Sequence, residues 1–249
     1  SREAKLVCAE TVDAHLSRVV HAGLARGYVV LITADHGNLE ELWTESGTPH
    51  VAHTSNPVEF ILLDPKAQTP AKLRNGKLAD IAPTVLSALG IEKAASMEGA
   101  TLAPDYDWGG KRKVMLVILD GWGIGRMDNS NPIYLGHTPA WHGILRQYPS
   151  CRLDASGEAV GLQAGKPGNS EAGHMNIGAG RIVLSAGQVL DQRPAGDVDR
   201  MNGRAARADD HRVGMAALDD PQGFLQSEQG GGVGAGDRVV GAAGVVLDR

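Results

Sequence analysis

The sequence predicts an α/β protein with a mostly parallel sheet and an irregular C-terminal tail. Two short apolar runs rich in β-branched residues, 28–33 and 114–119, have the pattern of strands buried on both faces, as in parallel sheets. Segments with helical spacing of apolar residues alternate with these runs, which favours strands interleaved with helices. In such sheets ligands gather at the carboxyl ends of the strands, so the residues that follow a strand are the first functional candidates.

The first 90 residues contain elements in the order helix, strand, strand, helix. Apolar residues recur at helical spacing over residues 3–26, and Gly27 is a plausible stop signal. The strand at 28–33 follows, a polar loop leads to a second apolar run at 58–63, and a further helix is predicted between Asp80 and Gly90.

The second part repeats the pattern of a buried strand followed by helices. The strand at 114–119 is followed by a short helix that Thr138 and Pro139 begin and that extends to about Tyr148. A glycine-rich stretch then leads into a predicted helix over residues 170–179.

Composition divides the chain into four segments. Residues 104–112 read as a linker between two parts of one domain, 1–103 and 113–190. From residue 191 onward there is no sustained period of 2 or 3.6, so residues 191–249 are predicted to be a low-complexity, disordered tail.

Charge and cysteine content limit the classes of partner. The chain has 29 acidic and 24 basic residues and no Lys/Arg-rich stretch, so neither nucleic acid nor an anionic membrane is expected as a partner. A small or metal-bound ligand fits better. Cys8 and Cys151 are too few and too far apart for a disulfide framework or a cysteine zinc site, which indicates a reducing compartment, and we expect the cytoplasm. The apolar runs are too short to span a membrane.

Three side chains that follow the predicted strands could bind a divalent cation. Asp35 and His36 come after the first strand, and Asp120 comes after the strand at 114–119. Any one of them alone is more often the cap of a loop or helix, but three together favour a metal site. Mixed oxygen and nitrogen ligands favour Mn²⁺ or Zn²⁺ over Ca²⁺. His50 and His53 lie in the following loop, and we expect one of them to reach a metal.

Ser170 stands in an unusual setting, GNSEAGHMNIGAGR, at residues 168–181. The free N–H groups and dipole of the helix that starts there favour an anion such as a phosphate or a serine alkoxide. The alternative is an ordinary N-cap serine. We favour a functional serine because the surrounding glycines permit close approach of a bulky charged group. A serine hydroxyl is a weak nucleophile until a base or metal lowers its pKa.

Several long motifs resemble those of cofactor-independent (2,3-bisphosphoglycerate-independent) phosphoglycerate mutases, of the alkaline phosphatase superfamily. Two look like that family's amino-terminal motifs: VILDGWGIG at 117–125 and the serine motif at 168–181. Three look like its carboxy-terminal motifs: LITADHGNLE at 31–40, PHVAHTSNPVEFI at 49–61 and LADIAPTVLSALGIE at 78–92. Together the matches cover about residues 1–190.

The resemblance implies a partial alkaline-phosphatase-like three-layer sandwich and a role for each candidate. Ser170 would be the nucleophile that becomes phosphoserine, and the ligands of one Mn²⁺ would be Asp35, His36, Asp120 and the Ser170 oxygen. His53 would belong to a second Mn²⁺. The family's reaction moves phosphate between the 3- and 2-positions of glycerate in glycolysis and needs no 2,3-bisphosphoglycerate. The expected partner is therefore a phosphoglycerate, bound by a monomer at residues that remain unassigned.

The chain departs from the family in order and in content. The carboxy-terminal motifs precede the amino-terminal ones, with the joint at 104–112, which a circular permutation, a gene rearrangement or an assembly error would each produce. A D-x-x-G-H-T-G-like segment, which the resemblance places just before Ser1, has no copy in this sequence, so we expect the second metal site to be incomplete. The sugar-acid-binding segment is also missing after the serine motif. We therefore expect weak or no mutase activity, and two rivals stay open: another metallophosphatase or phosphomutase of the superfamily, which GNSEAGH argues against, and an inert rearranged fragment.

Overall fold

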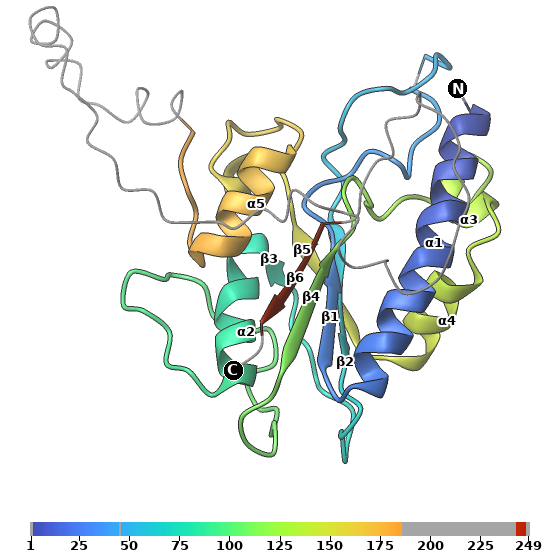
Figure 1. Ribbon diagram of the computed structural model, residues 1–249. Helices are drawn as coiled ribbons and strands as arrows, with labels where there is room; N and C mark the ends of the chain where they lie inside the picture. Colours follow the sequence, from blue (N-terminus) through green and yellow to red (C-terminus); the bar gives the residue numbers. More distant parts are fainter. Residues whose placement is uncertain (1, 45, 186–242, 248–249) are drawn as a thin grey trace, which may run out of the picture. The chain divides into compact units, whose positions relative to one another are not determined.

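A six-stranded sheet lies between two layers of helices (Figure 1). The computed structural model describes residues 2–44, 46–185 and 243–247, the last by its backbone alone. The helices are α1 (Arg2–Ala25), η1 (Leu78–Asp80), α2 (Ile81–Leu89), α3 (Pro132–Leu135), α4 (Pro139–Gln147), η2 (Gly157–Val160) and α5 (Ser170–Ala179). The strands are β1 (Val29–Thr33), β2 (Val58–Leu63), β3 (Gly76–Lys77), β4 (Val114–Ile118), β5 (Ser150–Asp154) and β6 (Ala243–Leu247), in the order β3-β5-β2-β1-β4-β6.

Helices α1, α3 and α4 cover one face of this sheet, and α2 and α5 cover the other (Figure 1). This arrangement confirms the predicted α/β class. Among the described residues, no helix has both the length and the apolar character that crossing a bilayer requires.

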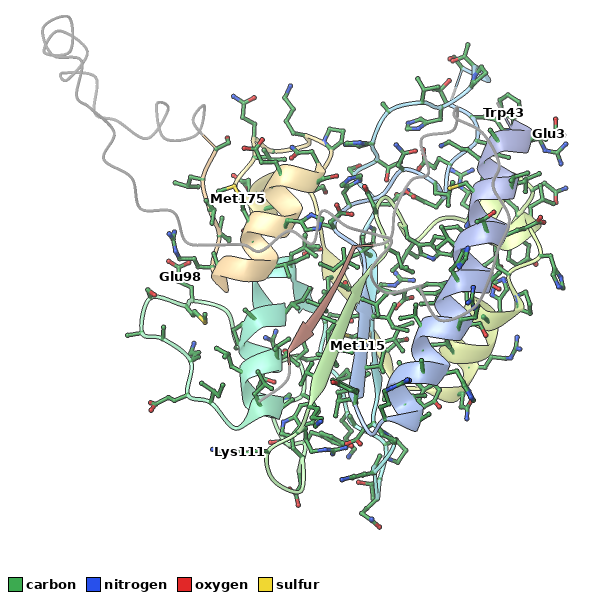
Figure 2. All side chains as sticks on the ribbon, in the orientation of Figure 1. Glu3, Trp43, Glu98, Lys111, Met115 and Met175 are labelled. Carbon is green, nitrogen blue, oxygen red and sulfur yellow. The ribbon has the colours of Figure 1, made fainter. Side chains whose placement is uncertain are left out.

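The central strands β1 and β4 pair in parallel, as the two apolar runs predict. Val29 lies opposite Val114, and the register continues to Thr33 opposite Ile118. The whole of β1 is buried. Close packing of α1 holds the two strands: a Cβ at Gly23 would lie 3.0 Å from Val30 Cγ2 and 3.1 Å from the sulfur of Met115. Met115 is labelled on β4 in Figure 2.

Four of the six strands, β1, β3, β4 and β5, run in the same direction, whereas β2 and β6 run against them. β2 lies between β5 and β1 and pairs with both in antiparallel fashion, and β6, at the edge of the sheet, is antiparallel to β4. The β1–β2 pairing has a simple cause. Residues 34–57 contain no helix among those described, so they do not form the helical crossover by which parallel neighbours are usually joined.

The longer predicted helices are confirmed, and α2 shows how one ends. Its C-cap Gly90 takes a left-handed conformation with φ 67°, and its N–H donates to the carbonyls of Leu86 and Ser87. Glycine adopts this conformation at little cost, so Gly90 stops the helix where the sequence predicts.

Strands β3, β5 and β6 are not predicted from the sequence. The strand β5 alternates exposed and buried residues but follows α4 almost directly and contains Arg152 and Asp154, which are untypical of strands. Within the predicted tail 191–249, the described residues Ala243–Leu247 form β6, which pairs with β4 along its full length. The other residues of that predicted tail, 191–242 and 248–249, lie outside the described part of the chain.

The predicted linker at 104–112 is packed against the domain. Trp108 is buried and its Nε1 donates to Ser87 Oγ at 3.0 Å. At its end Arg112 forms a two-pronged ion pair with Asp64, at 2.5 and 2.7 Å, and both side chains are buried. Burial opposes ionisation of Asp64, but Arg112 and the Lys66 amide outweigh it and lower the pKa of the carboxyl.

We predict that Asp64→Asn lowers the free energy of unfolding by about 3 kcal/mol at neutral pH, because it leaves the Arg112 guanidinium buried without its counter-charge. The lowered pKa makes the wild-type contribution complete above the unfolded-state value of about 4, and it is lost as the pH falls through the folded-state value. The difference between the two proteins should therefore shrink in acid. Denaturant unfolding at several pH values measures it. Asp128→Asn, at an exposed carboxylate, is the control, and equal effects of the two substitutions would contradict the prediction.

Candidate metal centre

The register of β1 and β4 brings Asp35 and Asp120 together. Thr33 lies opposite Ile118, and each aspartate follows its strand by the same two residues. The ladder continues past the strands, since the Leu119 N–H donates to the Thr33 carbonyl at 2.8 Å. The Gly121 N–H then donates to Asp35 Oδ1 at 3.2 Å. The two carboxylates therefore leave the same edge of the sheet side by side, although they are far apart in the sequence.

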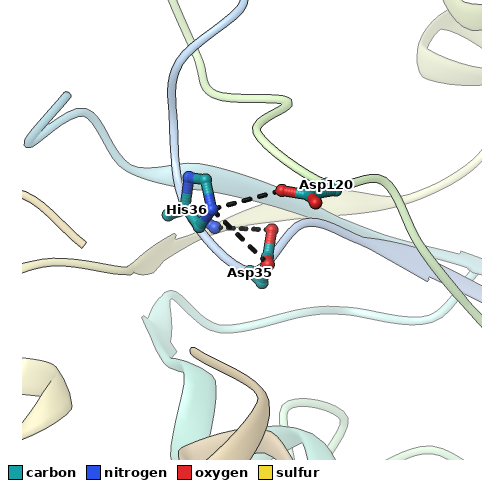
Figure 3. Close-up of side chains that lie close together, drawn as sticks. All are labelled: Asp35, His36 and Asp120. Atoms are coloured by element: carbon teal, nitrogen blue, oxygen red, sulfur yellow. Dashed lines mark hydrogen bonds and ion pairs between the residues drawn. The ribbon is translucent and has the colours of Figure 1, made fainter. Parts of the chain in front are cut away.

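His36 points its Nε2 at both carboxylates (Figure 3). This nitrogen lies 3.2 Å from Asp120 Oδ1 and 3.6 Å from Asp35 Oδ2. The other ring nitrogen, Nδ1, lies 3.1 Å from the Gly37 carbonyl, which can only accept, so Nδ1 carries a proton. In the neutral ring the lone pair is therefore on Nε2. Burial disfavours the charged ring, but Asp120 and Asp35 outweigh it and raise the pKa of His36. The position thus attracts positive charge.

One oxygen of Asp35 is buried without a hydrogen-bond partner. The side chain is fully buried, and Oδ2 has no donor. His174 Nδ1 approaches it to 3.4 Å, but that nitrogen hydrogen-bonds the Ser170 carbonyl at 2.9 Å. Burial opposes ionisation of Asp35, yet His174, His36 and the Gly121 amide together lower its pKa. A charged, buried and unpartnered oxygen is costly unless a cation satisfies it.

Ser170 presents its hydroxyl to the same point. Its Oγ lies 3.0 Å from His36 Nε2 and 3.4 Å from Asp120 Oδ1. The N-cap of α5 is Asn169, whose side chain accepts from the Ala172 N–H, so Ser170 is the first helical residue. The alternative of an N-cap serine is therefore wrong, and the Ser170 hydroxyl is left to face the carboxylates.

Two glycines of the serine motif, Gly168 and Gly173, have a different use from the one expected. The protein's own chain, and not a ligand, occupies the space beside them. A Cβ at Gly173 would lie 2.9 Å from Asp35 Cβ, and one at Gly168 would lie 2.9 Å from His36 Cβ and overlap the Ala155 carbonyl. Both glycines therefore allow α5 to pack directly on the segment that carries the metal candidates.

Of the two loop histidines, His53 lies at the site and His50 pairs elsewhere. The His53 ring stacks on that of His36, with centroids 4.0 Å apart, and its Nδ1 contacts the Gly168 carbonyl at 2.9 Å. His50 Nε2 instead lies 3.7 Å from Glu41 Oε2. Among the described residues, the group with converging ligand atoms is Asp35, His36 and Asp120, whose ligand atoms all lie within 4.8 Å of one another, and His53 is not part of it.

Sequence reasoning assigned no role to His174, which contacts both Ser170 and Asp35. A signal was present, since His174 follows Ser170 by four residues within the predicted helix, and that spacing places both on one face. The contact with Asp35 raises the pKa of His174.

Comparison with known proteins gives one family match. The model of the metalloenzyme superfamily matches residues 1–93 and 112–224. The match leaves out most of the segment 104–112 and continues beyond residue 190, where the motif resemblance ends. No solved structure matches the chain.

Curated relatives match over part of their length. The chain is 56% identical over 99 residues to the 2,3-bisphosphoglycerate-independent phosphoglycerate mutase of Syntrophotalea carbinolica, which covers 40% of this chain and 19% of the relative. It is 51% identical over 81 residues to that of Mycoplasma pneumoniae, covering 32% and 16%. Mutase 1 of Methanosarcina barkeri is 55% identical over 73 residues, covering 29% and 14%. The chain thus spans about a fifth or less of the length of these relatives.

Two glycines of α5 allow a direct test of the packing at the site. Gly173→Ala should lower thermal stability and displace Asp35, because the added methyl group meets Asp35. Gly178→Ala, on the same helix, has nothing within 4 Å of its Cβ and should raise stability by up to about 1 kcal/mol through helix propensity. Thermal unfolding measures both changes, and a Gly173→Ala protein as stable as Gly178→Ala would show that the close approach is unnecessary.

Proposed function

Because this chain belongs to the metalloenzyme superfamily, we propose that Asp35, His36 and Asp120 hold one divalent cation, Mn²⁺, beside the hydroxyl of Ser170. The observation that carries the proposal is the convergence of their ligand atoms within 4.8 Å around the unpartnered Asp35 Oδ2. Two carboxylates and an imidazole form a donor set that suits Mn²⁺ or Zn²⁺, and no thiolate is among them.

Phosphoryl transfer through Ser170 is the chemistry that these residues support. A bound divalent cation supplies positive charge that favours the ionised serine oxygen and offsets charge on a phosphate. Ser170 Oγ stands at the start of α5, where the helix dipole favours negative charge. The Ser170 hydroxyl gives up its proton, the new bond forms between Oγ and phosphorus, and the bond from phosphorus to the substrate oxygen breaks as that oxygen takes up a proton. His174 and Gly173 hold the first turn of α5 against Asp35.

The named relatives extend this proposal to a reaction. We propose that the site derives from a 2,3-bisphosphoglycerate-independent phosphoglycerate mutase, the name of the relatives, and that its reaction is the interconversion of 3- and 2-phosphoglycerate in glycolysis through a phosphoserine. His53 is the ligand that this chain offers to a second Mn²⁺. A phosphoglycerate as the small-molecule partner, a cytoplasmic location and a monomeric state belong to the same proposal.

Hydrolysis of a phosphate ester is the second candidate activity. The groups for the first transfer, Ser170 and the three metal candidates, lie together within this chain. Retention of a glycerate between two transfers requires further groups that grip it. With water as the acceptor, the same serine site performs the reaction of a phosphatase.

The first prediction from this site concerns metal stoichiometry. The metal-free chain should bind one Mn²⁺ tightly. A titration monitored by calorimetry, or by the electron paramagnetic resonance of the free ion, measures this stoichiometry. Asp120→Asn should weaken it more than about 100-fold, because loss of a direct ligand exceeds the 10- to 100-fold effect typical of outer partners. His50→Ala is the matched control, since His50 pairs with Glu41. Two equivalent tight sites, or none, would contradict this.

The second prediction concerns turnover. With Mn²⁺, the chain alone should show no measurable conversion of 3- to 2-phosphoglycerate, because loss of each key stabilising group commonly costs about 3 kcal/mol in the transition state and several are needed. It should slowly hydrolyse an activated ester such as p-nitrophenyl phosphate, and Ser170→Ala should abolish that hydrolysis. Robust mutase activity that disappears in Ser170→Ala would show that the chain is sufficient for the full reaction. Hydrolysis that survives in Ser170→Ala would exclude Ser170 as the nucleophile.

A further inference from the structure

Glu40 is a buried carboxylate that accepts four hydrogen bonds. The residue is 1% exposed. Its Oε1 accepts from the Thr54 hydroxyl in a short hydrogen bond and from Asn56 Nδ2 at 3.0 Å. Its Oε2 accepts from the N–H of Asn38 at 2.8 Å and of Gly123 at 3.1 Å. Four donors to one carboxylate satisfy its oxygens in the ionised form, so Glu40 has a filled shell and no spare lone pair aimed at a ligand.

These four donors come from three segments that also contain the candidate site residues: the loop after β1, the segment before β2 and the segment after β4. Asn38 follows Asp35 and His36 in the loop after β1. Thr54 and Asn56 follow His53 in the segment before β2, and the Thr54 N–H also donates to the Gly37 carbonyl at 3.0 Å. Gly123 follows Asp120 by three residues. The Glu40 carboxylate is thus a common acceptor for three segments that are separate in the sequence.

Two glycines in these segments leave room for the Glu40 side chain. A Cβ at Gly37 would overlap both the Thr54 hydroxyl and the Glu40 carboxylate, and a Cβ at Gly123 would overlap the carboxyl group of Glu40. A third, Gly125, lies against its backbone: a Cβ there would be 2.8 Å from the Glu40 carbonyl. The glycines of TADHGN and DGWGIG therefore permit the carboxylate to enter between the loops.

Lys5 places a positive charge near the same junction from another layer of the fold. Its Nζ donates to the carbonyls of Asn38 and Glu41, each at 2.7 Å, so α1 is also tied to the loop after β1. The charge of Lys5 is attracted to Glu40 without a direct contact between them. The groups that Glu40 contacts directly are therefore backbone N–H groups and the neutral side chains of Thr54 and Asn56.

We propose that Glu40 is a positioning residue of the metal site: its carboxylate fixes the separation of the segments that present Asp35 and His36, His53, and Asp120. The effect on metal affinity rests on the proposed function, whereas the effect on the arrangement of the loops does not. Glutamine at this position keeps the size of the side chain but has one oxygen fewer, so it cannot accept from all four donors at once. The three segments then lose their common acceptor, and the ligands lose their fixed spacing.

The test compares Glu40→Gln with Asp13→Asn in the full chain. Asp13 is also buried and accepts two backbone N–H groups, those of Ala140 and Trp141, but it joins α1 to α4, away from the candidate ligands. Glu40→Gln should weaken Mn²⁺ binding about 10- to 100-fold, the range for partners of direct ligands, and Asp13→Asn should leave it within about twofold. Thr54→Val, which removes one donor, should shift affinity in the same direction by less and covers the case in which Glu40→Gln does not fold.

Nuclear magnetic resonance of the histidine rings in the metal-free protein gives a second readout. The stacked rings of His36 and His53 shift each other's ring resonances, and Glu40→Gln should move both, whereas Asp13→Asn should not. Unchanged Mn²⁺ affinity together with unchanged His36 and His53 resonances in Glu40→Gln would overturn the proposal. Equal losses of affinity in Glu40→Gln and Asp13→Asn would also overturn it, because they would reflect general destabilisation. If the wild-type chain binds no Mn²⁺, the proposed function fails and the ring resonances alone decide the role of Glu40.

Discussion

The parallel, in-register pairing of β1 and β4 is the constraint on which the site depends. Asp35 and Asp120 belong to distant parts of the sequence and meet because their strands end level with each other. A slip of one residue would turn one aspartate toward the opposite face of the sheet. When both faces of a strand are buried, an alternation of polar and apolar residues cannot set its register. Specific contacts with neighbouring segments must set it instead. Gly23 of α1, packed on Val30 and Met115, and the Gly121 amide bound to Asp35 supply that fit.

Much of this arrangement can be predicted from the sequence because its signals are local. The continuous apolar runs of β1, β2 and β4 identify strands, and the glycine after α2 identifies the end of a helix. Asp35, His36 and Asp120 follow from the general rule that ligands bind at the carboxyl ends of strands, and the structure brings them together. Ser170 depends on its motif, because no strand precedes it directly and its meeting with His36 results from the packing of α5.

The features that sequence reasoning missed depend on contacts between distant segments. The strand β5 lacks typical strand residues and exists because it pairs with β2 and β3. The antiparallel direction of β2 is consistent with the lack of a helix among the described residues of 34–57, a signal that can be used only once β2 is known to be the neighbour of β1. The glycines of the serine motif were expected to admit a ligand, but Gly173 and Gly168 instead admit Asp35 and His36, and no local pattern distinguishes the two uses.

The buried carboxylates of Asp35 and Glu40, five residues apart in the sequence, differ in the number of hydrogen-bond donors that they receive. Glu40 receives a donor at every contact and faces no ligand, so it stabilises the junction of the loops. Asp35 is buried as deeply, yet its Oδ2 has no hydrogen-bond partner and lies near the carboxylate of Asp120 and near His36 Nε2, which carries a lone pair in the neutral ring. A folded protein retains such a convergence of acceptors only if rigid surroundings enforce it and a cation can satisfy it. The Glu40 carboxylate, with all its hydrogen bonds made, therefore supplies the rigid surroundings that Asp35, with its unpartnered oxygen, requires. Together the two residues account for a site that attracts positive charge.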